Sequence, residues 1–310
     1  MRIAIYGAGG VGAYIGGRLQ AGGHEVCFIA RGRNLAALRD SGLSIKSTQG
    51  DLVLPKVAVT DDPASVGPVD VILLGVKLYD LERAAETLKP LLGPKTMLVP
   101  VQNGVDAADR LVAVLGPGPV VKGAVYIVSF LTAPGQVEHR TPFCKLVFSE
   151  LDNQPSQRTA DFAATLNGSG MEGVVSANID ADLWRKFLML APFAAVACLT
   201  RAPLAQVLAH PATRSLLADA VAEVAAVARA RGIVLPDDMA AKTLEAMAGF
   251  PPASRPSMQL DLDAGRPLEL ESLSGAVVRF GAAAGVATPV HDVAYRALSL
   301  YTSGSARPPA

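Results

Sequence analysis

A lysine near the start of a long apolar segment is the residue in this sequence that is best suited to proton transfer. Lys186 follows Asp182 and Arg185 and stands early in the apolar segment 183–199. At helical spacing these three side chains can share one side of a helix. Two interpretations remain open. Lys186 is either a surface residue whose stem lies along apolar neighbours, or it is held in a cleft where its ammonium donates a proton.

A glycine-rich turn near the N-terminus predicts phosphate binding. The strand-like run 2–6 ends there, and helical spacing resumes afterwards. Gly7 allows a sharp turn, Gly9 removes the Cβ that would hold a pyrophosphate away, and Gly12 lets the helix pack on the strand. The helix N-terminus then presents free N–H groups to the phosphates. The turn as a whole consists of Gly7, Ala8, Gly9, Gly10, Val11 and Gly12, and its position between a strand and a helix is the context that a dinucleotide-binding fingerprint requires.

The end of the second predicted strand favours NADPH over NADH. An Asp or Glu about 20 residues beyond the glycines would bind the ribose hydroxyls of NAD. Here the strand 25–30 is followed by Arg31 and Arg33. Guanidinium groups suit the extra phosphate of NADP. The alternative is that both arginines only face solvent.

Two further predicted strands end at polar residues. The continuous apolar run 69–76 stops at Lys77, and the run 96–101 stops at Gln102, Asn103 and Gly104. Such runs are typical of buried parallel strands. Ligands of parallel sheets bind beyond the carboxyl ends of the strands, so we expect Lys77 and Asn103 to lie near a ligand.

The composition indicates an apolar globular protein without a dominant charge. Of 310 residues, 50% are hydrophobic and 18% are charged, and 28 Lys and Arg balance 28 Asp and Glu. This balance points neither to nucleic acid nor to an anionic membrane. Cys27, Cys144 and Cys198 have no CxxC or metal-ligand spacing, so we expect reduced thiols and no metal site. No leader and no membrane-spanning run is recognised, and we expect a soluble, cytoplasmic protein.

Strands dominate up to residue 175 and helices dominate beyond it. We predict an α/β protein with an N-terminal Rossmann-type dinucleotide-binding domain at 1–175, an all-α substrate and catalytic domain at 176–302 and a disordered tail at 303–310. The first part is expected to contain a hairpin-like excursion at 43–59, helices at 81–92 and 158–166, a strand at 120–128, and a hairpin formed by 134–139 and 145–148. The second part is expected to contain helical segments at 183–199, 212–231, 239–247, 273–284 and 289–301.

Taken together, these motifs resemble the ketopantoate reductase (2-dehydropantoate 2-reductase) family. The resemblance is carried in order along nearly the whole chain by GAGGVGAYIGGRL at 7–19, Lys77, QNG at 102–104, NIDADLWRK at 178–186 and SMQLDLDAGRPLELESLSG at 257–275. It implies a Rossmann domain joined to an all-α domain like that of 6-phosphogluconate dehydrogenase, with the active site in the cleft between them. It also implies a role in pantothenate biosynthesis.

The resemblance implies a role for each candidate residue. Lys186 would be the general acid, and Glu269 would orient it and hold a substrate hydroxyl. Ser257 would bind the substrate. Reduction of a 2-oxo carbon builds negative charge on its oxygen, which an ammonium stabilises and protonates. The implied substrate-binding residues are Asn103, Ser257 and Lys77, and the implied NADPH-binding residues are Gly7, Ala8, Gly9, Gly10, Val11, Gly12, Arg31, Lys77, Asn103 and Glu269.

The segment after Lys186 departs from the family pattern. The family has asparagines one and two turns after the lysine that contact ketopantoate, and this sequence has Leu190 and Ala194 there. Each hydrogen-bonding partner left unmet costs about 1 to 3 kcal/mol. Pro192 also removes a helix hydrogen bond and is expected to kink this wall. We therefore expect a more apolar substrate pocket than in the family.

Three functions are compatible with these features. The first is NADPH-dependent reduction of a 2-oxo acid, with ketopantoate as the leading substrate. The second is a related D-2-hydroxy acid dehydrogenase that acts on a bulkier, less polar 2-oxo acid. The third is a catalytically silent NADPH sensor, against which the joint presence of Lys186, Asn103, Ser257 and Glu269 argues. The sequence leaves open whether the chain forms a homodimer.

Overall fold

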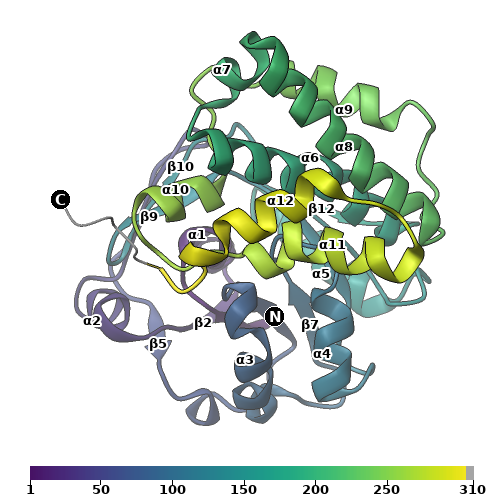
Figure 1. Cartoon of the computed structure of the whole chain (residues 1–310). Coiled ribbons are helices and arrows are strands. Elements are labelled where there is room, and N and C mark those ends of the chain that lie inside the picture. The colour runs from purple at the N-terminus through teal and green to yellow at the C-terminus, as the bar shows by residue number, and fades with distance from the viewer. Residues whose placement is uncertain (305–310) are drawn as a thin grey trace. The chain divides into compact units, whose positions relative to one another are not determined.

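The computed structural model describes residues 1–304 and divides the chain into two compact units (Figure 1). The first unit comprises Met1–Gln102 and Asp106–Ile179, and the second comprises Asn103–Val105 and the chain from Asp180 onward. The tail predicted at 303–310 lies outside the described residues from position 305. Each unit is described below by itself.

A five-stranded parallel sheet forms the centre of the first unit. Its strands follow the order β5-β2-β1-β6-β7, and β1, β6 and β7 are almost entirely buried because helices cover both faces. The strands are β1 (Arg2–Tyr6), β2 (Glu25–Ile29), β5 (Ala58–Thr60), β6 (Val71–Leu74) and β7 (Met97–Pro100). The associated helices are α1 (Gly10–Ala21), α2 (Gly32–Ser41), α3 (Leu81–Thr87) and α4 (Ala107–Leu115). The predicted parallel, Rossmann-type sheet is confirmed.

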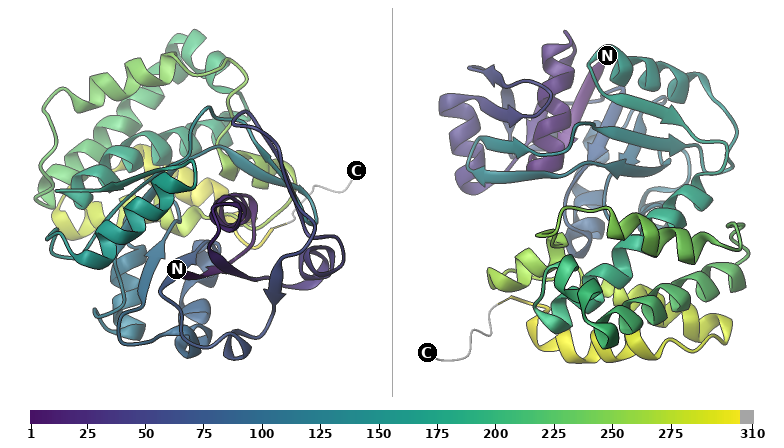
Figure 2. Two further views of the ribbon diagram at one scale, coloured as in Figure 1. Left: turned by 180° about the vertical axis from the view of Figure 1, so that it is seen from behind. Right: turned by 90° about the horizontal axis from the view of Figure 1, so that it is seen from above.

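Two smaller sheets complete this unit, and they overturn one predicted hairpin. One sheet has the order β4-β3-β10-β9 and the other β12-β11-β8, with α5 (Gln157–Gly168) packed against β12 (Figure 2). The predicted pairing of 134–139 with 145–148 is wrong, because β10 pairs with β9 and β3 whereas β11 pairs with β8 and β12. Alternating apolar residues identify a strand but not its partner. The strands are β3 (Leu43–Ser47), β4 (Leu52–Leu54), β8 (Lys122–Tyr126), β9 (Ser129–Ala133), β10 (Gln136–His139), β11 (Lys145–Ser149) and β12 (Glu172–Val175).

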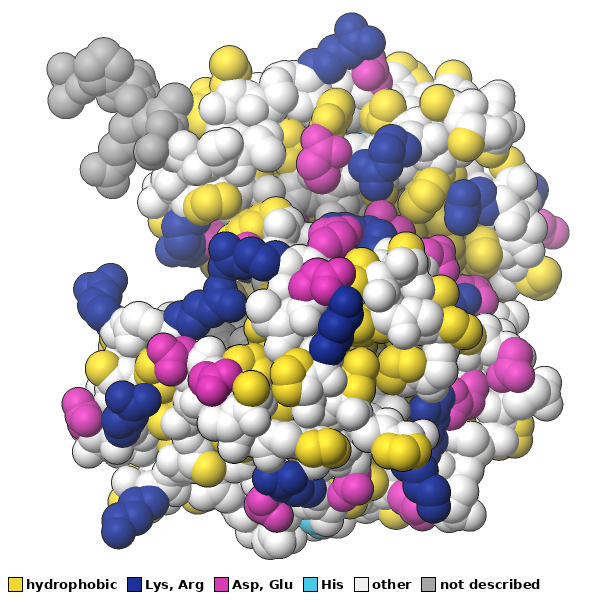
Figure 3. Space-filling view, turned by 90° about the horizontal axis from the view of Figure 1, so that it is seen from below, with side chains coloured by type: hydrophobic (Ala, Val, Ile, Leu, Met, Phe, Trp, Pro, Cys, Tyr) yellow, Lys and Arg dark blue, Asp and Glu magenta, His cyan; other side chains and the backbone are white. Residues whose placement is uncertain are grey.

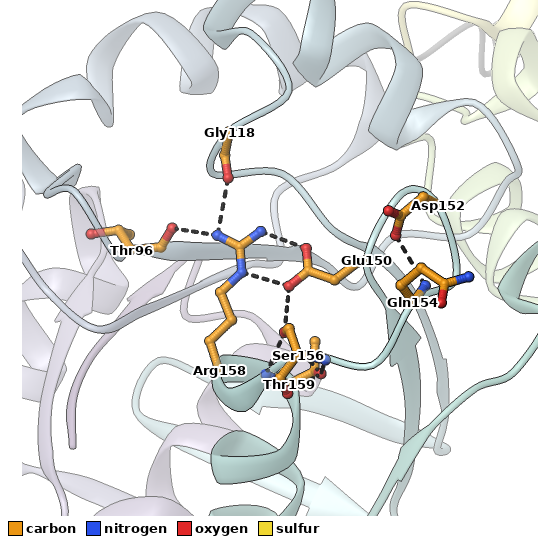
Figure 4. A network of polar contacts seen from close by, with 8 residues as sticks. All are labelled: Thr96, Gly118, Glu150, Asp152, Gln154, Ser156, Arg158 and Thr159. Atoms are coloured by element: carbon orange, nitrogen blue, oxygen red, sulfur yellow. Dashed lines mark hydrogen bonds and ion pairs between the residues drawn. The ribbon is translucent and has the colours of Figure 1, made fainter.

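A half-buried arginine connects several of these elements (Figure 4). Arg158 in α5 donates two hydrogen bonds to the carboxylate of Glu150, at 2.7 and 2.5 Å, and one to the carbonyl of Gly118 at 3.0 Å. The hydroxyl of Ser156, which caps α5, donates to the same carboxylate at 2.6 Å. The network therefore joins the start of α5 to the end of β11 and to the loop before β8.

The second unit is helical. Its core is formed by α6, α8 and α11 and contains Trp184, Leu188, Val221, Val224 and Val277. The five predicted helical segments are present, and two short helices, α7 and α10, were not predicted. The helices are α6 (Ile179–Thr200), α7 (Leu204–Ala209), α8 (Pro211–Ala230), α9 (Met239–Ala248), α10 (Ser257–Asp263), α11 (Ser274–Ala284) and α12 (Pro289–Leu298). The α/β fold class with a helical C-terminal part is thus confirmed.

Helix α6 is the one helix of residues 1–304 that is long and apolar enough to cross a membrane by length and composition. This is weak evidence, because the core helix of a soluble protein passes the same test. Here 67% of the most apolar window of α6 is buried inside the folded chain.

Charged side chains of both signs are interspersed on the face shown in Figure 3. This mixture agrees with the formal net charge of zero. No single-sign field that would attract a polyanion covers that face.

Candidate active site

Close backbone approach explains two glycines of the N-terminal turn. Gly7 has φ +102°, and a Cβ on it would lie 2.8 Å from the backbone of Gly75 and of Val76. A Cβ on Gly12 would lie 2.2 Å from the carbonyl oxygen of Gly7. Real Cβ atoms do not come this close, so the crossing of α1 over the end of β1 requires glycine at both positions.

Gly9 has a different environment. A Cβ there would meet no atom within 4 Å, so the backbone borders open space at the N-terminal end of α1. The N–H groups of the first helical turn, at Gly10, Val11 and Gly12, have no carbonyl four residues earlier within the helix to bind. Open space beside these donors fits the pyrophosphate of a dinucleotide.

The basic residues predicted to bind the cofactor have different surroundings. Arg31 is the N-cap of α2, and both Arg31 and Arg33 are exposed, with no hydrogen-bond or ion-pair partner for their guanidinium groups within residues 1–304. Their guanidinium groups are therefore available for a phosphate. Lys77 follows β6, precedes a short 3-10 helix (Leu78–Asp80) and is half-buried, and its side chain already takes part in interactions within the protein.

The helical unit brings Lys186 and Asn103 together. The ammonium of Lys186, in the second turn of α6, donates to Oδ1 of Asn103 at 3.0 Å. Asn103 lies three residues after the end of β7, yet it packs with the helical unit. Gly104 has φ +129°, a conformation that only glycine adopts readily, so the QNG turn redirects the chain at this point.

Burial tunes the acidity of Lys186. Burial lowers the pKa of its ammonium from 10.5 to about 8, and the negative charge of Glu269 opposes this shift. Glu269 is itself 7% exposed and precedes a 3-10 helix (Leu270–Ser272). An amine whose pKa lies near neutrality can serve as an acid, since it is mostly protonated at pH 7 and releases its proton readily.

Ser257 is not part of this contact. It is the first residue of α10 and half-buried, and its hydroxyl makes no hydrogen bond within the described chain. A hydroxyl without a protein partner remains able to bind a ligand. The structure therefore brings Lys186, Asn103 and Glu269 into one electrostatic cluster, and it leaves Ser257 without a direct contact to it.

The two positions that depart from the family pattern differ in accessibility. Leu190, one turn after Lys186, is partly exposed, whereas Ala194 is 0% exposed and packs in the core of the helical unit. Only Leu190 can therefore present an apolar surface next to Lys186. Helix α6 continues from Ile179 to Thr200 with Pro192 inside it, so the proline does not end the helix.

Within residues 1–304, neither the two buried cysteines nor a group of metal-binding side chains supplies a second reactive site. Burial raises the pKa of the thiols of Cys144 and Cys198 to about 12, so both are unreactive. Within residues 1–304, no group of three or more His, Cys, Asp and Glu side chains is arranged to hold a metal ion.

Three residues near the predicted sites were not recognised as such from the sequence. Ser129 and Asn34 contact the glycine turn, and Gln102 is 8% exposed with both side-chain polar atoms unpartnered within the described residues. Gln102 belongs to the QNG motif and directly precedes Asn103, and this position is the signal that the sequence carries. Ser129 and Asn34 carried no local signal, because their contacts arise from pairings that are distant in sequence.

Comparisons with known proteins identify the family. The family model described as ketopantoate reductase PanE/ApbA matches residues 3–153, and the model of its C-terminal region matches residues 178–302. An uncharacterized oxidoreductase, YkpB of Bacillus subtilis, is 28% identical over 301 residues, which cover 97% of this chain and 99% of that protein. The crystal structure of a PanE/ApbA family ketopantoate reductase from Ralstonia eutropha matches this chain with a TM-score of 0.90 and 32% sequence identity. The match covers 97% of this chain and 98% of the Ralstonia eutropha chain.

A ternary structure of D-mandelate dehydrogenase with NADH and anilino(oxo)acetate matches this chain with a TM-score of 0.88 and 24% sequence identity. The match covers 97% of this chain and 98% of the dehydrogenase chain. This likeness is one of fold. The two family models together span most of the sequence, in the order of the two structural units. The chain therefore belongs to the ketopantoate reductase PanE/ApbA family of dinucleotide-dependent oxidoreductases.

Proposed function

We propose that this protein reduces a 2-oxo acid to the corresponding 2-hydroxy acid with NADPH, and that ketopantoate is the leading substrate. The observation that carries the proposal is the half-buried side chain of Lys186, whose ammonium has a pKa of about 8 and has Asn103 and Glu269 as neighbours. Family membership supports the reaction class. The enzyme is proposed to work in the cytoplasm, in line with its free cysteines.

Each side chain of the cluster has a proposed task. Lys186 stabilises the negative charge that develops on the 2-oxo oxygen and donates its proton there. Asn103 holds the ammonium in position through its Oδ1, and the charge of Glu269 keeps the amine protonated near neutral pH. The unpartnered hydroxyl of Ser257 is proposed to bind the substrate carboxylate.

The first unit is proposed to hold the cofactor. Gly7 to Gly12 would receive the pyrophosphate, Arg31 the 2′-phosphate, and Lys77 the nicotinamide half. When bound, NADPH supplies the hydride that reduces the 2-oxo carbon. The open space at Gly9 and the unpaired guanidinium of Arg31 support this assignment.

A second candidate substrate class follows from Leu190. Its partly exposed apolar side chain stands one helical turn from Lys186, where a hydroxylated substrate would need a hydrogen-bonding partner. A bulkier, less polar 2-oxo acid would fit this wall better. That the same fold accommodates an aromatic oxo acid analogue in D-mandelate dehydrogenase is compatible with this alternative.

NADPH oxidation against ketopantoate and a panel of branched and aromatic 2-oxo acids tests the proposal, with NADH as the alternative cofactor. We expect turnover with NADPH for at least one acid. In Lys186→Ala we expect loss of turnover with retained NADPH binding, because the amine is proposed to act in proton transfer and not in holding the dinucleotide. Retained turnover in that variant would remove Lys186 as the acid, and strict preference for ketopantoate would remove the second candidate.

A further inference from the structure

The glycine turn is held from the side by strand β9. The hydroxyl of Ser129, the first residue of β9, donates to the carbonyl oxygen of Gly10 at 2.9 Å. A Cβ on Gly10 would lie 2.5 Å from the carbonyl oxygen of Ser129 and 2.8 Å from Cα of Phe130. Gly10 is therefore a glycine because β9 packs on it, whereas Gly9 faces open space.

A second connection runs from the turn between β9 and β10. The amide of Asn34 in α2 donates to the carbonyl oxygen of Ala8 at 2.7 Å and accepts from the backbone N–H of Gly135 at 2.8 Å. Gly135 has φ +72° and links β9 to β10. The β9–β10 hairpin thus reaches the glycine turn at two points, directly through Ser129 and indirectly through Asn34.

These contacts fix the direction of particular N–H groups. A trans peptide is planar, so its carbonyl and the N–H of the next residue point in opposite directions within one plane. Anchoring the carbonyl of Ala8 therefore fixes the N–H of Gly9, and anchoring the carbonyl of Gly10 fixes the N–H of Val11. Both N–H groups lie in the turn that borders the open space at Gly9.

We propose that the β9–β10 hairpin preorganises this turn for the pyrophosphate of a nicotinamide dinucleotide, and that Ser129 and Asn34 are positioning residues for cofactor binding. The inference rests on the proposed cofactor site. Donors already aimed at the ligand avoid the entropy cost of ordering the loop on binding. Pyrophosphate is common to both nicotinamide dinucleotides, so the effect is independent of the 2′-phosphate.

Dissociation constants of NADPH and NADH, measured by calorimetry on the full-length protein, test this inference. In Ser129→Ala we expect both constants to rise by a similar factor of about three to ten, the worth of one hydrogen bond. Ser129→Thr keeps the hydroxyl and should restore tight binding. Asn34→Ala should weaken both dinucleotides in the same way, whereas Arg31→Ala should weaken NADPH alone.

Thr132→Val is the matched control on the same strand. The hydroxyl of Thr132 donates to the backbone carbonyl of Gln136 at 3.3 Å and does not contact the glycine turn. This variant should bind both dinucleotides as the wild type does. Melting temperatures of the ligand-free variants separate positioning from folding, and we expect that of Ser129→Ala to stay close to the wild-type value.

Two results would overturn the inference. One is unchanged affinity for both dinucleotides in Ser129→Ala. The other is that Ser129→Ala and Thr132→Val both lose affinity, each in proportion to its loss of melting temperature. Failure of the wild type to bind either dinucleotide would instead refute the proposed function, so the two failures are distinguishable.

Discussion

The acidity of Lys186 results from two opposing influences on one amine. Burial lowers its pKa, because a charged group is poorly solvated there, and Glu269 raises it through its negative charge. The outcome, about 8, places the loss of the proton just above neutral pH. The proposed reduction needs the protonated form, so activity should fall as the pH rises through this value.

Removing the charge of Glu269 should shift the pH above which activity declines. In Glu269→Gln the opposing influence is lost, the pKa of Lys186 falls, and the alkaline decline of kcat/KM should begin at lower pH. A kcat/KM profile between pH 6 and about 10 measures the shift. Glu271→Gln is the control, because Glu271 is an exposed carboxylate that pairs with Arg279 and Tyr295. An unshifted profile in Glu269→Gln would show that Lys186 does not set the alkaline limit.

At the scale of one element, α6 is proposed to combine proton transfer with substrate selection. Lys186 and Leu190 stand one turn apart, so they share a side of the helix. Ala194 continues this side but is fully buried. Only the first of the two departures from the family pattern is thus open to a substrate.

Leu190→Asn should raise kcat/KM for ketopantoate relative to apolar 2-oxo acids, by about tenfold for one hydrogen bond regained. The physical reason is that the amide can satisfy a substrate hydroxyl that leucine leaves unpaired. Ala194→Asn should instead lower the melting temperature without this gain, because it places a larger polar group in a packed core. Competition assays and thermal melts measure both effects. An unaltered preference in Leu190→Asn would place the substrate away from this side of α6.

At the scale of the whole molecule, the Arg158 network shown in Figure 4 joins segments that are far apart in the sequence. Burial alone would raise the pKa of Glu150, but the hydrogen bonds from Arg158 and Ser156 outweigh it, and the pKa is lowered. A carboxyl with a lowered pKa in the folded state stabilises that state fully above its unfolded pKa. This contribution is lost as the pH falls through the folded pKa.

Glu150→Gln should therefore destabilise the protein at pH 7, by about 2 to 4 kcal/mol, since it leaves the Arg158 guanidinium without its carboxylate. The difference in the free energy of unfolding between Glu150→Gln and the wild type should become smaller at about pH 3, where the wild-type carboxyl is protonated and therefore uncharged like the glutamine. Chemical denaturation at both pH values measures this trend. Glu138→Gln is the control, because Glu138 pairs with Arg140 at the surface and such pairs contribute little. A pH-independent difference would contradict the role of the charge.

The sequence by itself determined the features that depend on local spacing. The glycines at 7, 9 and 12, the apolar runs that became β1, β6 and β7, and the longer helices all follow from residues that are near one another along the chain. Backbone conformation and periodicity act over a few residues, so these features could be predicted. The family resemblance arose from the same local motifs.

Only the tertiary structure decided which distant segments meet. It paired β10 with β9 and β3, placed Ser129 against Gly10 across 119 residues and Gly135 against Asn34 across 101, and buried Ala194 while leaving Leu190 accessible. It also produced the pKa of Lys186, which depends on burial and on the distant Glu269. These properties arise from packing between segments that are far apart along the chain. Local sequence patterns could not specify them, because such patterns reflect only interactions between residues that are near one another in the sequence.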